Sequence, residues 1–508
     1  MMVAFHTIAL LIIVLYFWIK SVKRRDLPPG PTPLPIIGNA HQLFWGLLMG
    51  KSHIEVCLEW KRRYGNVFTI YVGPFHNVVF ADYKTVVEAF VKNAEDYAAR
   101  PWSFLFNDVR NNKGISFASG PGWLEQRRFS LKTLRDFGFG RNIMQQRILD
   151  EFRYRTGELD RQFRELKGKS MIINPRLFLD ILIASIVNRV LVGYRYDEGH
   201  MDEFQILKLA LDQEFETMTL WDTVFINKTN YKLPGFYQRY KMIGEQQEVL
   251  VDHMQRTVVK RREEIASGSH LLDIENDGED YLDAYYIMLD KKKKNDEFTG
   301  WFSDEALAAN LSDLWMAGTQ TTIVALLWFF VFALNDLAVQ KKLREESYSI
   351  TKGDRDVELT DRPNMPYTNA VVTEVLRCGS ILNFSFLRET TKETVVEGHV
   401  LPKKTSVVAQ ISIMFRDDKD YPDPGKFDPE RFLRDKNLSK QVIAFGAGKR
   451  VCVGESLARA ELFLIITNFV QKYKFWPLEE LPPPTEELNS LLLLKKARPF
   501  LMNLEKVC

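Results

Sequence analysis

The segment FGAGKRVCVG, residues 445–454, determines how the rest of the chain is interpreted. It brings an aromatic residue, three glycines, an arginine and Cys452 together within ten positions, although the chain of 508 residues has only four cysteines. A helical pattern, ESLARAELFLIITNFVQKY, begins directly afterwards at about residue 455. Glycine lets a loop turn sharply or lets a bulky flat group approach the backbone. The pattern therefore indicates a binding loop.

Cys452 stands where a thiolate is favoured. A helix N-terminus and nearby cations stabilise a thiolate, and here the helix begins just after the cysteine while Lys449 and Arg450 precede it. Zinc takes three or four protein ligands, but no second Cys or His lies nearby in the sequence. A single thiolate suits haem iron, to which the porphyrin already supplies the other in-plane ligands. A structural cysteine in a glycine-rich turn is the alternative; the fixed spacing favours haem.

The composition allows a large buried core and gives no sign of a nucleic-acid partner. The chain is 46% hydrophobic and 12% aromatic, and its formal net charge is +2. A charge so close to zero, without a long basic arm, gives no general attraction for nucleic acid. The cysteines are widely scattered, which does not resemble a disulfide framework and favours a reducing, cytosol-facing compartment.

The amino-terminal region predicts a membrane anchor. Residues 2–19 carry no formal charge and would span about 27 Å as a helix, close to one bilayer core. Basic residues follow from Lys20, so the body should stay on the cytosolic side. A cleaved secretory signal is the alternative, but no basic residue precedes the apolar run. We predict an anchor over residues 1–20, a basic and proline-rich linker over 21–38, and one domain over 39–508.

The sequence after the linker predicts a single large domain, mainly α with a minor β-sheet. A hairpin pattern occupies residues 64–83, and short strand patterns return at 394–402 and near the carboxyl end. Helical patterns cover residues 141–165, 201–218, 238–266, 303–347, 366–378 and 455–472.

Two stretches of the sequence allow two structural interpretations each. Residues 314–335 are uncharged and could pass for a second membrane span, but a polar cluster interrupts them and Ser303 suits a helix cap, so a buried central helix is favoured. The four lysines of Lys291–Lys294 favour a solvated loop over a binding site.

The segment 445–454 resembles the haem-binding signature of the cytochromes P450, FxxGxRxCxG, at every fixed position. The likeness to the microsomal, drug-metabolising branch covers essentially the whole chain. It implies the cytochrome P450 fold and haem b with the Cys452 thiolate as its axial iron ligand. It also assigns the other matching residues to the haem-binding loop, namely Phe445, Gly448, Arg450 and Gly454.

The resemblance extends to residues that hold the fold and the haem. Glu374 and Arg377 resemble the family's Glu-x-x-Arg pair, and Arg431 in FDPERF, residues 427–432, completes its buried ion network. Trp123 and Arg127 resemble the Trp-x-x-x-Arg helix that binds a haem propionate.

Further basic residues stand where the microsomal branch places groups that bind the propionates. By this likeness they are Arg100, Arg388 and Arg450; an ordinary surface arginine is the alternative for Arg100 and Arg388.

The segment AGTQTT, residues 317–322, resembles the family's oxygen-activating motif. The resemblance assigns Ala317 and Gly318 to the face of a helix over the iron and Thr321 to proton delivery. This chain departs from the family at Gln320, where the family has an acid. An amide orients water but does not exchange protons as a carboxylate does, so Gln320 predicts slower or leakier oxygen chemistry.

The resemblance implies a monooxygenase that inserts one atom of dioxygen into a small apolar substrate, such as a xenobiotic, fatty acid or steroid. Electrons would come from NADPH through NADPH–cytochrome P450 reductase, with cytochrome b5 as a further partner, at the endoplasmic reticulum membrane. The aromatic residues Phe104, Phe106, Phe117 and Trp315 are expected to line an apolar pocket. A haem protein without monooxygenase activity, either a peroxide isomerase or an inactive or sensor relative, is the alternative; Thr321 argues against the isomerase.

Overall fold

The computed structural model describes most of the chain. The described residues are 12, 13, 16, 27–101, 104–137, 143–166, 170–382, 385–478, 480–483 and 493–507. The predicted anchor over residues 1–20 and the first part of the linker lie almost entirely outside these residues.

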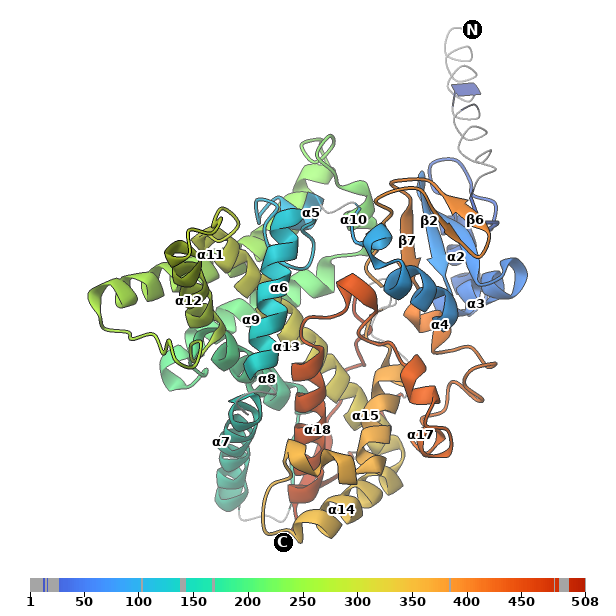
Figure 1. Ribbon diagram of the computed structural model, residues 1–508. Helices are drawn as coiled ribbons and strands as arrows, with labels where there is room; N and C mark the ends of the chain where they lie inside the picture. Colours follow the sequence, from blue (N-terminus) through green and yellow to red (C-terminus); the bar gives the residue numbers. More distant parts are fainter. Residues whose placement is uncertain are drawn as a thin grey trace.

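The described chain is mainly helical, as predicted, with helices gathered on one side and a small sheet on the other (Figure 1). The α-helices are α2 (Ala40–Leu48), α3 (His53–Tyr64), α4 (Tyr83–Val86), α5 (Phe104–Asn107), α6 (Pro121–Arg135), α7 (Ile143–Leu166), α8 (Pro175–Val192), α9 (Met201–Thr217), α10 (Leu220–Phe225), α11 (Phe236–Ser267), α12 (Tyr281–Lys294), α13 (Asp304–Asn335), α14 (Leu337–Thr351), α15 (Pro366–Gly379), α16 (Ile411–Met414), α17 (Arg431–Arg434) and α18 (Glu455–Lys472).

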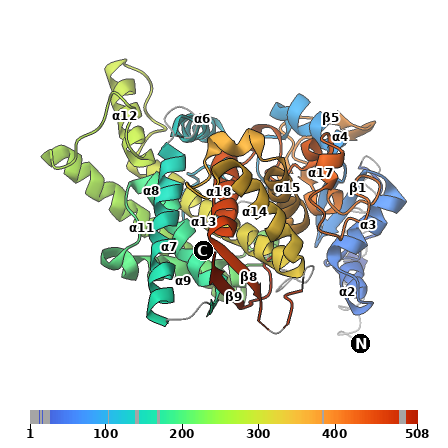
Figure 2. The same ribbon diagram turned by 90° about the horizontal axis from the view of Figure 1, so that it is seen from below.

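The largest sheet has the strand order β1-β2-β7-β4 and lies beside α2, α3 and α4 (Figure 1). The predicted hairpin forms its edge, because β1 and β2 pair antiparallel, and β2 then pairs parallel with β7. A second sheet, β3-β9-β8, lies beside α13 and α18, which contact its strand β8 (Figure 2). The strands are β1 (Val67–Val72), β2 (Phe75–Phe80), β3 (Ser170–Ile173), β4 (Arg388–Glu389), β5 (Thr394–Val396), β6 (His399–Leu401), β7 (Ser406–Ala409), β8 (Tyr473–Pro477) and β9 (Met502–Lys506).

Helix α13 runs through the middle of the helical side. It begins where predicted, because the Ser303 hydroxyl accepts a hydrogen bond from the Ala306 N–H at 3.2 Å. It is the one helix among the described residues that is long and apolar enough to cross a membrane, yet 78% of its most apolar window is buried in the protein. The structure therefore supports a buried core helix.

The predicted single helix over residues 303–347 is wrong in one respect, because it is two helices. Asp336 takes an extended conformation that ends α13, and its side chain accepts a hydrogen bond from the Ala338 N–H at 3.0 Å to cap α14. The stretch Lys291–Lys294, predicted as a loop, forms the last turn of α12. Cations are favourable there because the helix dipole is negative at its C-terminus.

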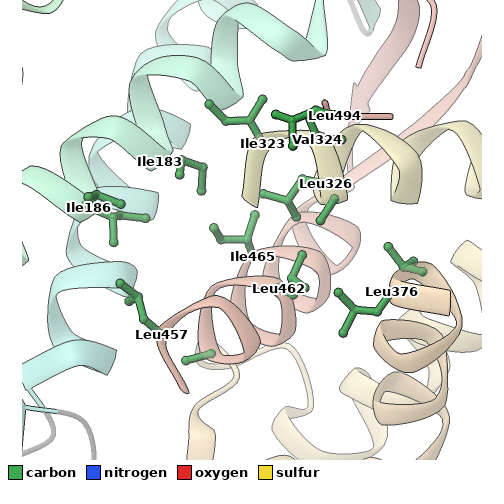
Figure 3. Packing of buried hydrophobic residues seen from close by; sticks show 14 of the residues in the cluster. Ile183, Ile186, Ile323, Val324, Leu326, Leu376, Leu457, Leu462, Ile465 and Leu494 are labelled. Carbon is green, nitrogen blue, oxygen red and sulfur yellow. The ribbon is translucent and has the colours of Figure 1, made fainter. Parts of the chain in front are cut away.

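The centre of the core joins α8, α13 and α18. Figure 3 shows Ile183 and Ile186 of α8, Ile323 of α13, and Leu462 and Ile465 of α18 facing one another, and all five are buried. Burial of each such side chain contributes about 1.5–3 kcal/mol. This packing fixes α13 and α18, the two helices that carry the sequence motifs.

The absence of a side chain at Gly318 allows α13 to lie close to α8. A Cβ atom there would stand 3.2 Å from a methyl group of Val187 in α8.

Candidate active site

The loop 445–454 is held by its own backbone and by one close approach. The Cys452 N–H donates to the Phe445 carbonyl at 2.9 Å. Gly448 has φ +68°, and a Cβ on it would stand 1.5 Å from the carbonyl oxygen of Phe90, in the short π-helix Val87–Lys92. Only glycine fits such a position, so Gly448 fixes the loop against this helix.

The thiol of Cys452 is accessible within the body of the protein. The residue is exposed by surface area, yet burial among neighbouring parts of the chain raises its pKa. The Gly454 backbone and the charge of Arg127 lower this pKa in part. Lys449 and Arg450, which the sequence suggested as cations beside the thiol, have other partners. Lys449 forms an ion pair with Glu95, and Arg450 donates to backbone carbonyls. A bound metal cation would favour the thiolate more strongly than any of these groups.

Arginines from four separate segments gather near this loop. Arg127 comes from α6, where it bonds the carbonyl of Val451, next to the cysteine. Most of their hydrogen bonds go to backbone carbonyls: Arg100 to Leu387 at 2.7 Å, Arg388 to Ala447 at 2.7 Å, and Arg450 to Ala98 at 2.7 Å and to Ala118 at 2.9 Å. The structure thus brings together the basic residues that the sequence analysis selected.

The arginine cluster, defined as Arg100, Arg127, Arg388 and Arg450, has an excess of positive charge. Burial, with repulsion from the other three guanidinium groups, lowers the pKa of Arg450 to about 7. The same two causes lower the pKa of Arg100 to about 10 and hold that of Arg388 well below its ordinary value. Among the described residues no carboxylate forms an ion pair with any of the four, and the Nη1 atoms of Arg388 and Arg450 have no hydrogen-bond partner. This donor set suits a ligand with two negative charges.

Trp123 contacts the arginine cluster through the face of its ring. The guanidinium carbon of Arg450 lies 3.4 Å from the centre of its ring. Its indole N–H donates to the Ile115 carbonyl at 3.0 Å, so in this structure it does not point its donor at the arginine cluster. Phe445, at the start of the loop, contacts Arg459 of α18, with 4.8 Å between ring centre and guanidinium carbon.

The small residues of α13 form an accessible strip in an otherwise buried helix. Ala317 is exposed and Thr321, one turn later, is half-buried. The Thr321 hydroxyl donates to the Ala317 carbonyl at 2.6 Å, and its lone pairs can still accept a hydrogen bond. Gln320 faces elsewhere: it is 1% exposed, and its amide N–H donates to Asp212 of α9.

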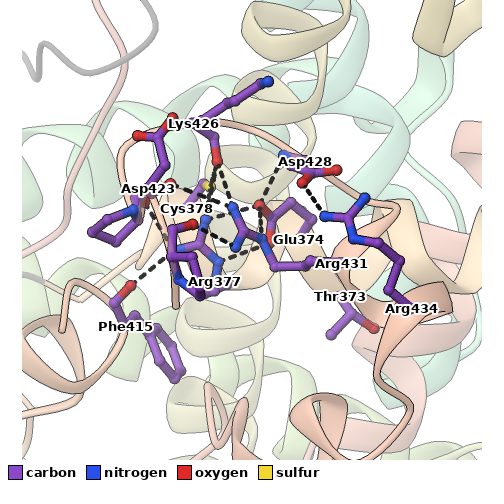
Figure 4. A network of polar contacts seen from close by, with 12 residues as sticks. Thr373, Glu374, Arg377, Cys378, Phe415, Asp423, Lys426, Asp428, Arg431 and Arg434 are labelled. Atoms are coloured by element: carbon purple, nitrogen blue, oxygen red, sulfur yellow. Dashed lines mark hydrogen bonds and ion pairs between the residues drawn. The ribbon is translucent and has the colours of Figure 1, made fainter. Parts of the chain in front are cut away.

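Glu374, Arg377 and Arg431 form a compact buried network (Figure 4). Arg377 binds both carboxylate oxygens of Glu374, at 2.7 and 2.8 Å, and Arg431 binds one of them at 3.0 Å. The Asp428 N–H donates to the same carboxylate at 2.9 Å. The three side chains are almost fully buried, and their remaining donors reach backbone carbonyls. This arrangement locks α15 to the segment that leads to the cysteine.

Sequence reasoning missed several buried polar residues near α13. Asp313 pairs with Arg110 at 3.1 Å and accepts the N–H groups of Ile115 and Ser116 at 2.8 and 2.9 Å, which anchors the segment before α6. Glu461 of α18 accepts a hydrogen bond from Thr322 at 3.0 Å. A single acidic residue within an otherwise apolar helix pattern could have indicated that Asp313 and Glu461 are buried and paired. The sequence does not indicate which residues are their partners.

The pocket prediction was wrong for Trp315. This residue is fully buried, and its indole N–H donates to the Tyr196 hydroxyl at 3.1 Å instead of facing the accessible strip. Phe106 and Phe117 stack with ring centres 3.8 Å apart, and Phe117 also meets the exposed Phe386.

Comparison with known proteins identifies the family. A family model described as Cytochrome P450 matches residues 28–503. The chain belongs to the cytochrome P450 family. It is 33% identical to the probable cytochrome P450 cyp-35D1 of Caenorhabditis elegans, over 89% of each chain. It is 32% identical to cytochrome P450 2U1 of Bos taurus, over 92% of this chain and 88% of that one, and 32% identical to cytochrome P450 2E1 of Rattus norvegicus, over 92% of each.

This membership makes the chain a haem-dependent cytochrome P450 monooxygenase, and the family holds its haem through a cysteine thiolate. The residues present fit that cofactor. In the described part of the chain, no group of three or more His, Cys, Asp or Glu side chains could hold a metal ion by itself. An accessible thiol beside an arginine cluster offers instead one axial ligand and partners for two propionates.

Proposed function

We propose that Cys452 is the axial ligand of haem b and that this monooxygenase inserts one atom of dioxygen into a small apolar substrate. The main support for this proposal is that the accessible thiol of Cys452 and the arginine cluster lie together in the interior, with no carboxylate of the described chain to balance the arginines. When bound, haem supplies the iron at which dioxygen is activated.

The chain's own residues would orient this cofactor. The Nη1 atoms of Arg388 and Arg450 are free to donate to propionates, and Arg100 and Arg127 add the charge that holds a dianion in a buried place. Gly448 and Gly454 keep the loop thin beside the thiol. Together they would fix the ring between the loop and α13.

Thr321 would hold a proton at its hydroxyl on the oxygen side. Its position one turn after the exposed Ala317 supports this role, because small side chains there leave room for dioxygen. The hydroxyl can donate and accept at once, as a proton relay requires. Gln320 precedes it and contributes no acid of its own.

The substrate is expected to be apolar, with xenobiotics, fatty acids and steroids as the candidate classes. Phe386 and Ala317 are accessible, and Phe117 connects Phe386 to Phe106. Aromatic rings of this kind bind apolar ligands by area and shape.

We expect electrons to come from NADPH through NADPH–cytochrome P450 reductase, with cytochrome b5 as a second donor. The exposed residues Arg128, Lys132 and Arg135 follow one face of α6, the helix that carries Arg127. A basic face near the haem suits an acidic electron-transfer partner.

We further propose that the chain works at the endoplasmic reticulum membrane with its domain in the cytosol. Apolar side chains are exposed on α2 and directly beside its two ends, after the predicted anchor and linker. Ile36, Phe44, Trp45, Leu48 and Met49 are each more than 60% exposed. An exposed apolar patch of this kind marks a membrane or protein contact.

Replacement of the cysteine tests the proposal. The purified wild-type protein, reduced with dithionite under carbon monoxide, should show the red-shifted Soret band of a thiolate-bound haem. Cys452→Ser should lose this band and the NADPH-dependent activity with reductase, whereas Cys57→Ser should keep both. A normal band in Cys452→Ser would overturn the assignment of the ligand. A normal band without NADPH consumption in the wild type would favour the inactive or sensor alternative.

A further inference from the structure

The amide nitrogen of Gln320 is bound by a carboxylate from another helix. Its amide Nε2 donates to the Oδ1 atom of Asp212, on α9. Residues 320 and 212 are 108 positions apart in the sequence, so this pairing is a product of the fold. Gln320 is 1% exposed, and a buried amide donor requires a partner of this kind.

Asp212 is held as an ionised group. Its Oδ2 atom pairs with Arg176 at 3.0 Å and also with Lys208, both cationic. These contacts, with the more distant charge of Lys496, outweigh the effect of burial and lower the pKa of Asp212. The carboxylate next to Gln320 is therefore charged at neutral pH.

The ion pairs continue from Asp212 toward the surface. Arg176 also pairs with Glu216 at 3.7 Å, and the Glu216 side chain is 43% exposed. Lys208 pairs with Asp180 at 3.3 Å, and both are about one-tenth exposed. These pairs hold the Arg176 and Lys208 side chains in place beside Asp212.

We propose that Asp212 supplies the carboxylate that position 320 lacks, and that it acts through the Gln320 amide to position water and protons beside Thr321. The proposal rests on the monooxygenase function proposed above. Because Asp212 accepts the Nε2–H, the amide is held with its carbonyl oxygen as the acceptor for water. Adjacent side chains on a helix diverge by about 100°, so Asp212 acts through Gln320 and solvent and does not touch Thr321. Asp212 is a positioning residue in this scheme.

The proposal predicts that placing a glutamate at position 320 will not by itself restore proton delivery. Gln320→Glu alone would set two carboxylates against each other, which costs stability and does not restore a working acid. The exchanged pair Gln320→Glu with Asp212→Asn again has one acid and one amide in contact. Asp212→Asn alone keeps a polar partner for Gln320 but removes the charge.

The experiment compares these three variants with wild type and with Glu216→Gln as the matched control. Glu216 belongs to the same ion-pair chain and contacts Arg176, but it does not contact Gln320. The first measurement is the thermal unfolding temperature of each haem-loaded protein. Gln320→Glu should unfold at a lower temperature than wild type, and the exchanged pair should recover most of the loss.

The second measurement is the hydrogen peroxide released per NADPH oxidised with reductase and no added substrate. Dioxygen leaves as hydrogen peroxide after two electrons and two protons, and as two waters after four of each. A defect in late proton delivery therefore raises the peroxide fraction. Asp212→Asn should raise it about threefold or more, a small part of the hundredfold that a positioned acid can supply. The exchanged pair should return toward wild type, and Glu216→Gln should not differ from it.

The outcomes separate this proposal from the one on which it rests. If Asp212→Asn and Glu216→Gln give the same peroxide fraction, or if Gln320→Glu lowers that fraction while Asp212 is present, then Asp212 is not the missing acid. If the wild type lacks the ferrous carbonyl band or consumes no NADPH, the monooxygenase proposal itself fails.

Discussion

The protein contains two groups of buried arginines, and they are built in opposite ways. Arg377 and Arg431 share Glu374, and burial, which would lower the pKa of Arg377, is outweighed by hydrogen bonding to Glu374 and by nearby negative charge, so this pKa is raised. In the arginine cluster no such acid is present among the described residues, and burial with mutual repulsion lowers the pKa of Arg450 to about 7.

The difference separates residues that hold the fold from residues arranged for a ligand. A buried charge is costly unless it is paired and hydrogen-bonded. The Glu374 network meets this condition within the chain, so removing a member should harm the protein with or without haem. The arginine cluster leaves donors free, so its members should matter most when an anion binds. Two substitutions test this contrast, and a third tests the effect of burial by itself.

Glu374→Gln should have the largest effect. It leaves Arg377 and Arg431 buried without a carboxylate, and breaking a buried ion pair by removing one partner costs about 3–5 kcal/mol. We expect little haem-loaded protein and a lower midpoint of denaturant unfolding. The exposed Glu430→Gln, which breaks the pair with Lys342, should leave that midpoint unchanged. A Glu374→Gln protein as stable as wild type would remove the structural half of the comparison.

Arg388→Met should have the opposite pattern. It removes one charge from the cluster, so the haem-free protein at neutral pH should be no less stable than wild type. Loss of a charged hydrogen bond to a propionate should speed haem transfer to apomyoglobin about ten- to a hundredfold. Arg344→Met is the control, since Arg344 donates to the carbonyls of Val470 and Tyr473, and it should not alter haem loss. Unchanged haem loss in Arg388→Met would count against a ligand role.

The sequence predicted local features well because they depend on neighbours in the chain. The hairpin at 64–83 and the helix over 455–472 follow from turn residues and periodicity, and the structure confirms both. The break at Asp336 was missed because the apolar pattern continues on both sides, although an Asp before a new helix is a cap signal. Lys291–Lys294 was misread because charge alone does not distinguish a loop from a final helical turn.

The candidate site was predictable to the extent that it lies in contiguous motifs. The loop 445–454 and the strip at Ala317 and Thr321 could be named from spacing alone. The partner of Gln320 could not, because Asp212 belongs to a helix whose placement depends on packing of the whole helical side. The unbalanced charge of the arginine cluster was hidden for the same reason, since its members come from four distant segments.

Glu461 is a third kind of buried ionisable group, because its pKa is shifted mainly by burial and not by neighbouring charges. Its pKa is raised to about 8 by burial, which the hydrogen bond from Thr322 offsets only in part. Between about pH 4.5 and about pH 8, the Glu461 carboxyl is protonated in the folded protein but ionised in the unfolded chain. The free energy of unfolding therefore falls as pH rises through this range.

Glu461→Gln should remove this loss, because glutamine carries no charge and its carbonyl can still accept from Thr322. The variant should come closest to wild type near pH 5 and exceed it by about 1.4 kcal/mol more for each pH unit up to pH 8, measured by denaturant unfolding across that range. The exposed Glu198→Gln should show no such difference that grows with pH. A flat difference for Glu461→Gln would mean that water or a charged neighbour compensates the carboxylate.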